Sequence, residues 1–173
     1  IATKTQSFIQ KVKDLNTIIL DTRKTCPSIR FLDKEAVKIG GAKNHRKGLY
    51  DTIMIKDNHI DFAGGIENAI NRSEKYLKKK KLTKTTVIIE VRNLKELNAV
   101  LRCGKINRIL LDNFSVQKTK QAVKIVNQKY PLETSGNITL NNIRDYAMCG
   151  VDYISIGNLT HSIKNIDLSM ACI

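Results

Sequence analysis

Residues 108–137 read RILLDNFSVQKTKQAVKIVNQKYPLETSGN. The apolar run Arg108–Leu111 predicts a strand, and Ser115–Gln128 predicts a helix that begins at an N-cap serine. A second strand is predicted at Pro131–Glu133. A strand, a helix and a strand in this order are typical of a βαβ unit, in which both strands lie parallel in one sheet.

The same alternation extends over the rest of the chain. Further strands are predicted at Thr17–Leu20, Thr52–Ile55, Thr86–Ile89 and Tyr153–Ile156, and further helices at Leu32–Ile39, Phe62–Lys80, Leu94–Arg102 and Leu140–Met148. The strands are mostly Ile, Val, Leu and Met without strict alternation, which suits a parallel sheet covered on both faces. No Gly-rich dinucleotide fingerprint follows the first strand, so a nucleotide-binding sheet is disfavoured. We therefore predict an α/β fold, an incomplete TIM-like barrel of about six parallel strands.

The domain organisation predicted from the sequence is simple. Ile1–Phe8 looks like the middle of a helix, with no N-cap before it. We expect residues 1–16 to form a helix that leads into the barrel from a domain outside this chain. Residues 17–173 are expected to form the catalytic barrel, since the chain is long enough for one domain with a substantial core.

The net charge of +14 has three competing interpretations. It can mark a solvated lysine-rich surface, and the run Lys78–Lys81 supports this interpretation. It can also mark a nucleic-acid-binding surface, or a site for a multiply anionic small molecule. A nucleic-acid-binding module is disfavoured because Tyr76 is the lone aromatic near the lysine run, and such modules stack bases on exposed aromatics.

The cysteines and the hydropathy bear on the cellular compartment. Cys26, Cys103, Cys149 and Cys172 form no CxxC pair, so neither a zinc knuckle nor a redox motif is expected. The sequence shows no secretory signal and no apolar run that could span a membrane. We expect a reduced, cytoplasmic protein with no membrane partner.

Each predicted strand is followed by a polar or glycine-containing cluster. These clusters are Asp21–Thr25, Lys56–His59, Glu90, Asp112–Asn113, Thr134–Asn137, and Gly157 with Thr160–Ser162. The carboxyl ends of barrel strands meet at one face, and in barrel enzymes that face holds the active site. We therefore predict one site built from all of these clusters.

The clusters divide by chemistry along the chain. The early part of the chain supplies cations, at Arg23, Lys24, His45, Arg46 and Lys56, and the middle part supplies the carboxylates Glu90 and Asp112. The late clusters hold Gly and Ser residues, whose backbone N–H groups suit a phosphate. An anionic substrate, an electron-poor carbon and a phosphate would fit these groups in turn.

Several motifs, in order over nearly the whole chain, resemble those of the quinolinate phosphoribosyltransferase family. They are Asp21–Thr25, Gly40–Arg46, Ile55–His59, Leu111–Phe114 and Leu159–Ser162. The resemblance implies a carboxylating nicotinate-nucleotide pyrophosphorylase, a pentosyltransferase of NAD biosynthesis. Such an enzyme joins quinolinate to phosphoribosyl pyrophosphate (PRPP) with Mg²⁺ as cofactor. The products are nicotinate mononucleotide, pyrophosphate and carbon dioxide.

The resemblance also implies roles for individual residues. The two quinolinate carboxylates would be held by Arg23, His45, Arg46 and Lys56, since charge-assisted bonds are strong. PRPP and its phosphates would be bound by Lys24, Glu90, Asp112, Ser135, Gly136, Asn137, Gly157 and His161. Lys56, Glu90 and Asp112 would be catalytic, with the two carboxylates stabilising an oxocarbenium-like transition state or binding Mg²⁺ directly or through water. His59 is expected to orient its loop, and His161 either joins the phosphate site or caps the last helix.

Departures from the family pattern leave the charged set intact. Ala42 and Asn137 stand where glycines are usual, and Ser28 follows Pro27 where glycine is common.

In the family an N-terminal domain covers the barrel mouth and, in the dimer, supplies an arginine to the partner's site. We therefore expect a homodimer or larger assembly of the intact protein, and weak or absent turnover by this chain alone. The alternatives are a paralogue with the same barrel and another acceptor, and a pseudoenzyme retained for assembly.

Overall fold

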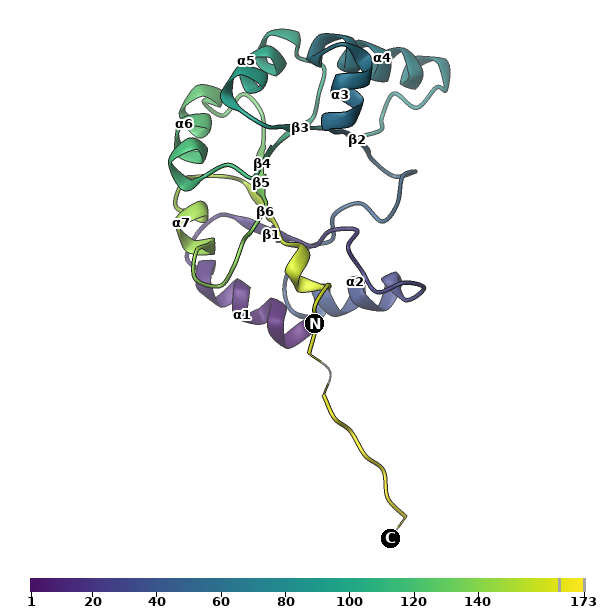
Figure 1. The fold of residues 1–173 in the computed structure, drawn as a ribbon, viewed down its shortest axis with the longest axis vertical. Coiled ribbons are helices and arrows are strands. Elements are labelled where there is room, and N and C mark those ends of the chain that lie inside the picture. The colour runs from purple at the N-terminus through teal and green to yellow at the C-terminus, as the bar shows by residue number, and fades with distance from the viewer. Residues whose placement is uncertain (165, 173) are drawn as a thin grey trace.

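The computed structural model describes residues 1–164 and 166–172. Positions 165 and 173 of the predicted barrel lie outside the described residues. Strands and helices alternate from α1 to β6, except that α3 and α4 follow each other, and the short 3-10 helix η1 comes last (Figure 1). The strands are β1 Ile18–Leu20, β2 Ile53–Ile55, β3 Val87–Val91, β4 Arg108–Asp112, β5 Leu132–Ser135 and β6 Tyr153–Ser155. The helices are α1 Ala2–Val12, α2 Arg30–Ile39, α3 Asp57–Ala63, α4 Ile66–Lys79, α5 Leu94–Cys103, α6 Val116–Val126, α7 Ile143–Ala147 and η1 Gly157–Leu159.

All six strands form one parallel sheet in the order β1-β6-β5-β4-β3-β2. The sheet curves with its helices on the outside, and β1 and β2 are its two edges (Figure 1). The predicted α/β fold, an incomplete barrel of parallel strands, is confirmed. An isolated bridge between Leu20 and Lys43 places the segment after α2 on the outer edge of β1.

Side-chain alternation along the strands separates an apolar shell from a polar interior. Ile89, Leu111 and Ile154 belong to the core between the sheet and the helices, with exposed fractions of 0%. The residues that alternate with them face the other side of the sheet and include Glu90 and Glu133, both buried. Burial on both faces explains why the strands read as continuous apolar runs broken by single acids.

Two kinds of boundary differ from the sequence prediction. The prediction of a single helix at Phe62–Lys80 is wrong, because two helices, α3 and α4, meet there. Gly64 caps the end of α3 and Gly65 precedes α4, with positive φ angles of 79° and 122°. The apolar spacing continues across this break, so periodicity alone could not reveal it. In addition, β3, β4 and β5 extend one or two residues beyond the predicted ends and include Glu90, Asp112 and Ser135.

The predicted helices at the two ends of the chain are also longer than the observed ones. The helix expected within residues 1–16 covers Ala2–Val12, and the one expected at Leu140–Met148 shortens to Ile143–Ala147. None of the described helices is both long and apolar enough to cross a membrane.

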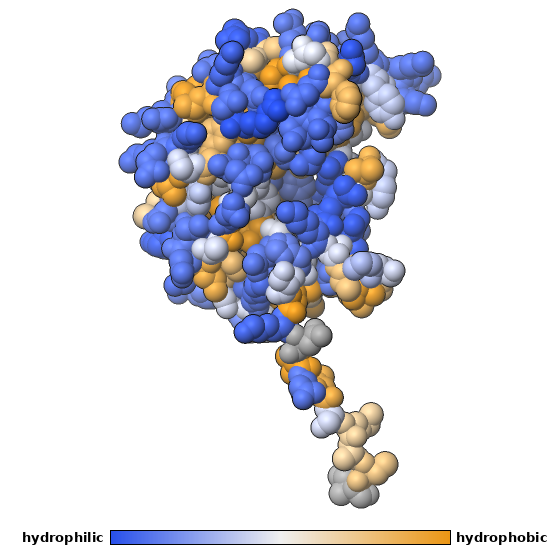
Figure 2. All heavy atoms as spheres, viewed as in Figure 1, coloured by the Kyte–Doolittle hydropathy of each residue, from blue (hydrophilic) through white to orange (hydrophobic). Residues whose placement is uncertain are grey.

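The surface is largely hydrophilic, and Figure 2 shows apolar atoms gathered in small groups, one of them over α2. This group includes Phe31, Leu32 and Ile39, which are 68%, 52% and 79% exposed.

Candidate active site

A cavity of about 520 Å³ opens at the carboxyl ends of the strands. Every site residue predicted from the sequence lines it: Arg23, Lys24, His45, Arg46, Lys56, Glu90, Asp112, Ser135, Gly136, Asn137, Gly157 and His161. The structure therefore brings the predicted residues together, although their contacts with substrates stay predictions. A cavity of this size holds a small molecule.

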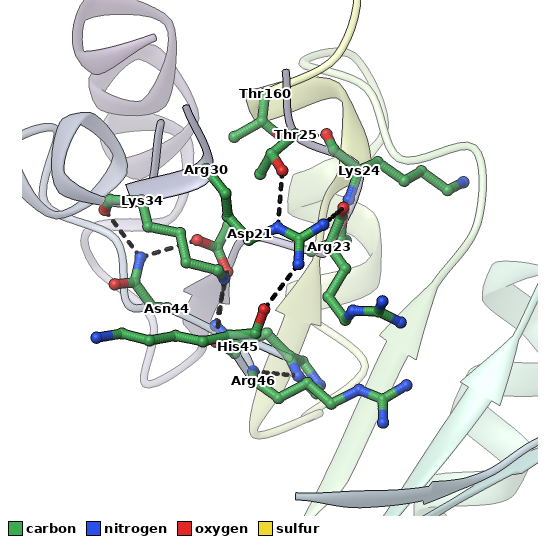
Figure 3. A network of polar contacts seen from close by, with 12 residues as sticks. Asp21, Arg23, Lys24, Thr25, Arg30, Lys34, Asn44, His45, Arg46 and Thr160 are labelled. Atoms are coloured by element: carbon green, nitrogen blue, oxygen red, sulfur yellow. Dashed lines mark hydrogen bonds and ion pairs between the residues drawn. The ribbon is translucent and has the colours of Figure 1, made fainter. Parts of the chain in front are cut away.

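One wall of the cavity carries the cations. Arg23 and Arg46 extend their guanidinium groups in the same direction, away from the supporting network (Figure 3). Burial lowers the pKa of Arg46, and the positive charge of Arg23 lowers it further. The Nη1 of Arg46 donates to the carbonyl of Thr52 at 3.2 Å, which leaves the rest of its fork for another acceptor. Two such forks facing one space suit an anion with planar carboxylates.

The buried Asp21 holds the loop that carries this wall. Its carboxylate accepts hydrogen bonds from Lys34 Nζ at 2.7 Å, Asn44 Nδ2 at 2.8 Å and the His45 backbone N–H at 2.7 Å (Figure 3). Burial raises the pKa of the Asp21 carboxyl, and the Lys34 charge acts in the opposite direction. Asp21 directly follows β1, so this network ties the segment around His45 and Arg46 to the edge of the sheet.

Two further side chains fix the backbone after β1. Arg30 donates to the carbonyls of Arg23 at 3.2 Å and Lys47 at 2.9 Å, so it joins two loops (Figure 3). Thr160 donates through Oγ1 to the carbonyl of Lys24 at 2.6 Å. The positions of Arg23 and Lys24 therefore depend on residues from α2 and from the end of the barrel.

The opposite wall carries carboxylates. Glu90 accepts a hydrogen bond from Lys56 Nζ at 2.6 Å, and Asp112 accepts from Ser135 Oγ at 3.2 Å and Asn113 Nδ2 at 2.9 Å. Burial raises the pKa of Glu90, Lys56 opposes this, and the charge of Asp112 adds to the increase. The two acids on this wall thus repel each other, and a cation bound between them would relieve the repulsion.

The remaining side of the cavity is built from turns. Gly136 has a positive φ of 96°, and a Cβ there would lie 2.1 Å from Oδ1 of Asn113. A Cβ on Gly157 would approach the His161 ring to 3.1 Å and Cδ of Lys24 to 3.2 Å. Both glycines therefore let these turns pack closely against neighbouring side chains, and backbone N–H groups of glycine-containing turns suit a phosphate.

Sequence reasoning missed several residues that line the cavity. They are Met54, Leu110, Glu133, Ile138, Thr139, Ser155, Ile156 and Asn158. Glu133 was treated as a strand end alone. The alternation of side chains along β5, whose sequence is LETS, could have identified Glu133. Residues two apart in a strand lie on the same face, so Glu133 shares a face with the predicted site residue Ser135.

The two histidines in the early motifs both have partners within the protein. The backbone N–H of Arg46 donates to Nδ1 of His45 at 2.7 Å, and Nε2 of His45 lies 3.2 Å from Oε1 of Glu133, outside hydrogen-bond geometry. The backbone N–H of Lys56 donates to Nδ1 of His59 at 2.9 Å, so His59, which lies in the first turn of α3 rather than in a loop, caps the start of that helix.

Metal binding was expected at Glu90 and Asp112. Within residues 1–164 and 166–172, no group of three or more His, Cys, Asp or Glu side chains is placed to hold a metal ion. Mg²⁺ does not need such a group, because it binds through one or two carboxylates, water and substrate phosphates. The two carboxylates facing one cavity fit an ion of this kind.

A comparison with known families agrees with the sequence motifs. Residues 1–171 match the family described as "Quinolinate phosphoribosyl transferase, C-terminal domain". The chain is 45% identical to the chloroplastic nicotinate-nucleotide pyrophosphorylase [carboxylating] of Arabidopsis thaliana, over 88% of this chain and 47% of that protein. It is 39% identical to the nicotinate-nucleotide pyrophosphorylase [carboxylating] of Mycobacterium leprae, over 98% of this chain and 59% of that protein.

Solved structures share the fold. The nicotinate-nucleotide pyrophosphorylase from Ehrlichia chaffeensis superposes with a TM-score of 0.89 and 43% identity, over 96% of this chain and 58% of that chain. The chain spans about half the length of the curated relatives it matches, 47% for the plant protein above.

Proposed function

This chain belongs to the quinolinate phosphoribosyltransferase family, and we propose that its cavity transfers the phosphoribosyl group of PRPP to quinolinate with decarboxylation. The observation that carries the proposal is the division of one cavity into three parts. Cations line one wall, Glu90 and Asp112 line another, and glycine-containing turns complete it. A dianionic ring, an electron-poor sugar carbon and a phosphate would occupy these parts.

Quinolinate binds against the cationic wall. Its two carboxylates lie toward the guanidinium forks of Arg23 and Arg46 and the ammonium of Lys56, because planar carboxylates favour bidentate arginine contacts. His45 lines the same wall. Lys56 is paired with Glu90, so it joins the substrate by leaving or sharing that ion pair.

Phosphoribosyl transfer forms a bond between the quinolinate nitrogen and the anomeric carbon, while the bond from that carbon to pyrophosphate breaks. Positive charge develops on the sugar, and the carboxylates of Glu90 and Asp112 stabilise it. Backbone N–H groups around Ser135, Gly136, Asn137 and Gly157 hold the 5′-phosphate, and the side chains of Lys24 and His161, which flank Gly157, make further contacts with it.

Glu90 and Asp112 would hold Mg²⁺, directly or through water. The ion, when bound, neutralises charge on the departing pyrophosphate.

Decarboxylation needs the positive charge that ribosylation places on the ring nitrogen. The bond from the adjacent ring carbon to its carboxylate breaks, carbon dioxide leaves, and that charge stabilises the carbanion. Lys56, beside the carboxylates and 44% exposed, is the protein group we assign to return a proton to this carbon.

Sequence beyond these 173 residues contributes to full turnover. The relatives are about twice as long as the matched region, and the cavity is open at the barrel mouth. The exposed apolar side chains of α2 support a protein partner, which we propose to be the rest of the enzyme within a homodimer or larger assembly.

We place the protein in the cytoplasm. The cysteines Cys26, Cys103, Cys149 and Cys172 are free thiols, as in a reducing compartment. Arabidopsis and tobacco relatives are named as chloroplastic or mitochondrial, so cell fractionation is the test.

The experiment measures binding and product together. Quinolinate and PRPP with Mg²⁺ should yield nicotinate mononucleotide and an equal amount of carbon dioxide. For the 173-residue chain alone, calorimetry should detect quinolinate binding that is much tighter than nicotinate binding, with little turnover. Equal affinity for the two acids would indicate a different acceptor, and turnover at the rate of the complete enzyme would refute the need for further sequence.

A matched pair of variants tests the cationic wall. Arg46→Met should weaken quinolinate binding by roughly 10- to 100-fold, since a charge-assisted bond is worth about 1.5–3 kcal/mol. Arg72→Met removes the same charge from α4, outside the cavity, and should leave binding unchanged. Equal effects of the two substitutions would contradict the assignment.

A further inference from the structure

Glu133 is a fully buried carboxylate at the floor of the cavity that the proposed reaction does not use. Its Oε2 accepts a hydrogen bond from Arg108 Nη1 at 2.9 Å, and the guanidinium of Arg108 stacks over the ring of Tyr153 at 4.0 Å. Its Oε1 accepts a hydrogen bond from Ser155 Oγ. Burial pushes the pKa of Glu133 upward, but His45, Ser155 and Arg108 together hold it below its usual value.

The ring of His45 has a protein neighbour at each nitrogen, a hydrogen bond at Nδ1 and a charged carboxylate close to Nε2. Its Nδ1 accepts a hydrogen bond from the backbone N–H of Arg46, so Nδ1 carries a lone pair and the proton of the neutral ring lies on Nε2. Nε2 is shielded from solvent and lies 3.2 Å from Oε1 of Glu133. Neither nitrogen is therefore available to a ligand in the cavity.

We propose that Glu133 is a positioning residue that fixes the tautomer and orientation of His45, and that His45 in turn sets the backbone from which Arg46 reaches quinolinate. His45 thus acts through Arg46 rather than by donating to a carboxylate. This inference rests on the proposed function for the identity of the ligand. The Glu133–His45–Arg46 arrangement itself rests only on the contacts above.

A glutamine at position 133 would reverse the tautomer preference. To keep an oxygen toward Arg108, its amide must present N–H groups toward His45, and these require an acceptor at Nε2. The ring proton would then move to Nδ1, where it opposes the N–H of Arg46. The substitution keeps the size of the side chain, so its main effect is to replace a carboxylate oxygen by an amide N–H group next to Nε2 of His45 and Oγ of Ser155.

The first measurement uses the unaltered full chain. The chain has three histidines, so the ¹⁵N shifts of their ring nitrogens can be resolved by NMR. His45 should be the Nε2–H tautomer at neutral pH. An Nδ1–H tautomer, or a ring that exchanges freely between the two forms, overturns the proposal without any variant.

The second measurement uses Glu133→Gln with quinolinate and inorganic phosphate as separate probes. Quinolinate binding should weaken by roughly 10- to 100-fold, the range typical when the partner behind a functional histidine is removed. Phosphate binding should be unchanged, because the glycine turns do not depend on His45. A shifted His45 tautomer with unchanged quinolinate binding, or equal losses for both probes, would overturn the proposal.

The control separates positioning from stability. Val100→Ala removes buried side-chain volume from α5, on the far side of the sheet from the cavity. It should lower stability without changing the His45 tautomer or quinolinate affinity. If the unaltered chain binds no quinolinate, the proposed function fails, and the ¹⁵N spectrum still decides the role of Glu133.

Discussion

Replacing Asp21 by asparagine should destabilise the fold more than any exposed charge change in this protein. The substitution keeps the shape of the side chain but removes its charge. Asp21 and Lys34 form an ion pair at 2.7 Å, with side-chain exposures of 0% and 3%. Asn44 and the backbone of His45 donate to the same carboxylate.

The expected magnitude follows from this burial. Breaking a buried pair leaves its partner charged and unsolvated, which costs about 3–5 kcal/mol, whereas exposed pairs contribute about 0–1 kcal/mol. A domain of this kind has a total stability of roughly 5–15 kcal/mol. Asp21→Asn should therefore remove a large share of it. Lys34→Met should have a similar cost, and the double variant should fall short of the sum by roughly 1–3 kcal/mol.

Urea unfolding followed by far-UV circular dichroism measures these values, since the chain has no tryptophan to report by fluorescence. Asp14→Asn is the control, because Asp14 pairs with Arg144 at 2.7 Å in an exposed position, and it should shift the urea midpoint much less than Asp21→Asn does. A cost below about 1 kcal/mol for Asp21→Asn, or strict additivity in the double variant, would refute the reasoning.

Two further predictions concern the phosphate turn and acid stability. Gly136→Ala should abolish phosphate binding, because its Cβ would overlap Oδ1 of Asn113. Gly150→Ala, with a similar φ of 88° and only an ordinary contact of 3.7 Å to Cγ1 of Val123, should cost about 1–2 kcal/mol and leave phosphate titrations unchanged. Hydrogen bonds from Lys105 and Lys78 lower the pKa of Glu74 to about 2. Because this folded-state pKa lies below that of the unfolded chain, the stabilisation is present above about pH 4.5 and is lost as pH falls toward 2. Urea midpoints measured across this range should show a smaller decline in Glu74→Gln, and an identical decline would contradict the assignment.

Much of the fold was predictable because it is encoded locally. The apolar runs at β3 and β4 and the helix around Ser115 follow from spacing, capping and the polar residues that end each run. Local signals also identified the residues of the cavity wall. They missed the break between α3 and α4 and predicted one helix, because Gly64 and Gly65 interrupt the helix without interrupting the apolar pattern.

The candidate site shows where local information ends. Arg23 and Arg46 were identified from their motifs, but Glu133 was not assigned to the site. Its role depends on Arg108, Ser155 and His45, which come from other elements. Burying a carboxylate in a strand costs free energy unless such partners bind it, and no local sequence pattern identifies those partners.

The sequence by itself determined the alternating strands and helices, the polar face at the strand ends and the chemical character of each part of the site. Those properties depend on neighbouring residues along the chain. Only the tertiary structure decided that the segment after α2 lies along the edge of β1, which brings the ring of His45 over Glu133 of β5 and away from direct donation to a ligand. The reason is geometric: curvature of the parallel sheet, not proximity in sequence, brings these two side chains together.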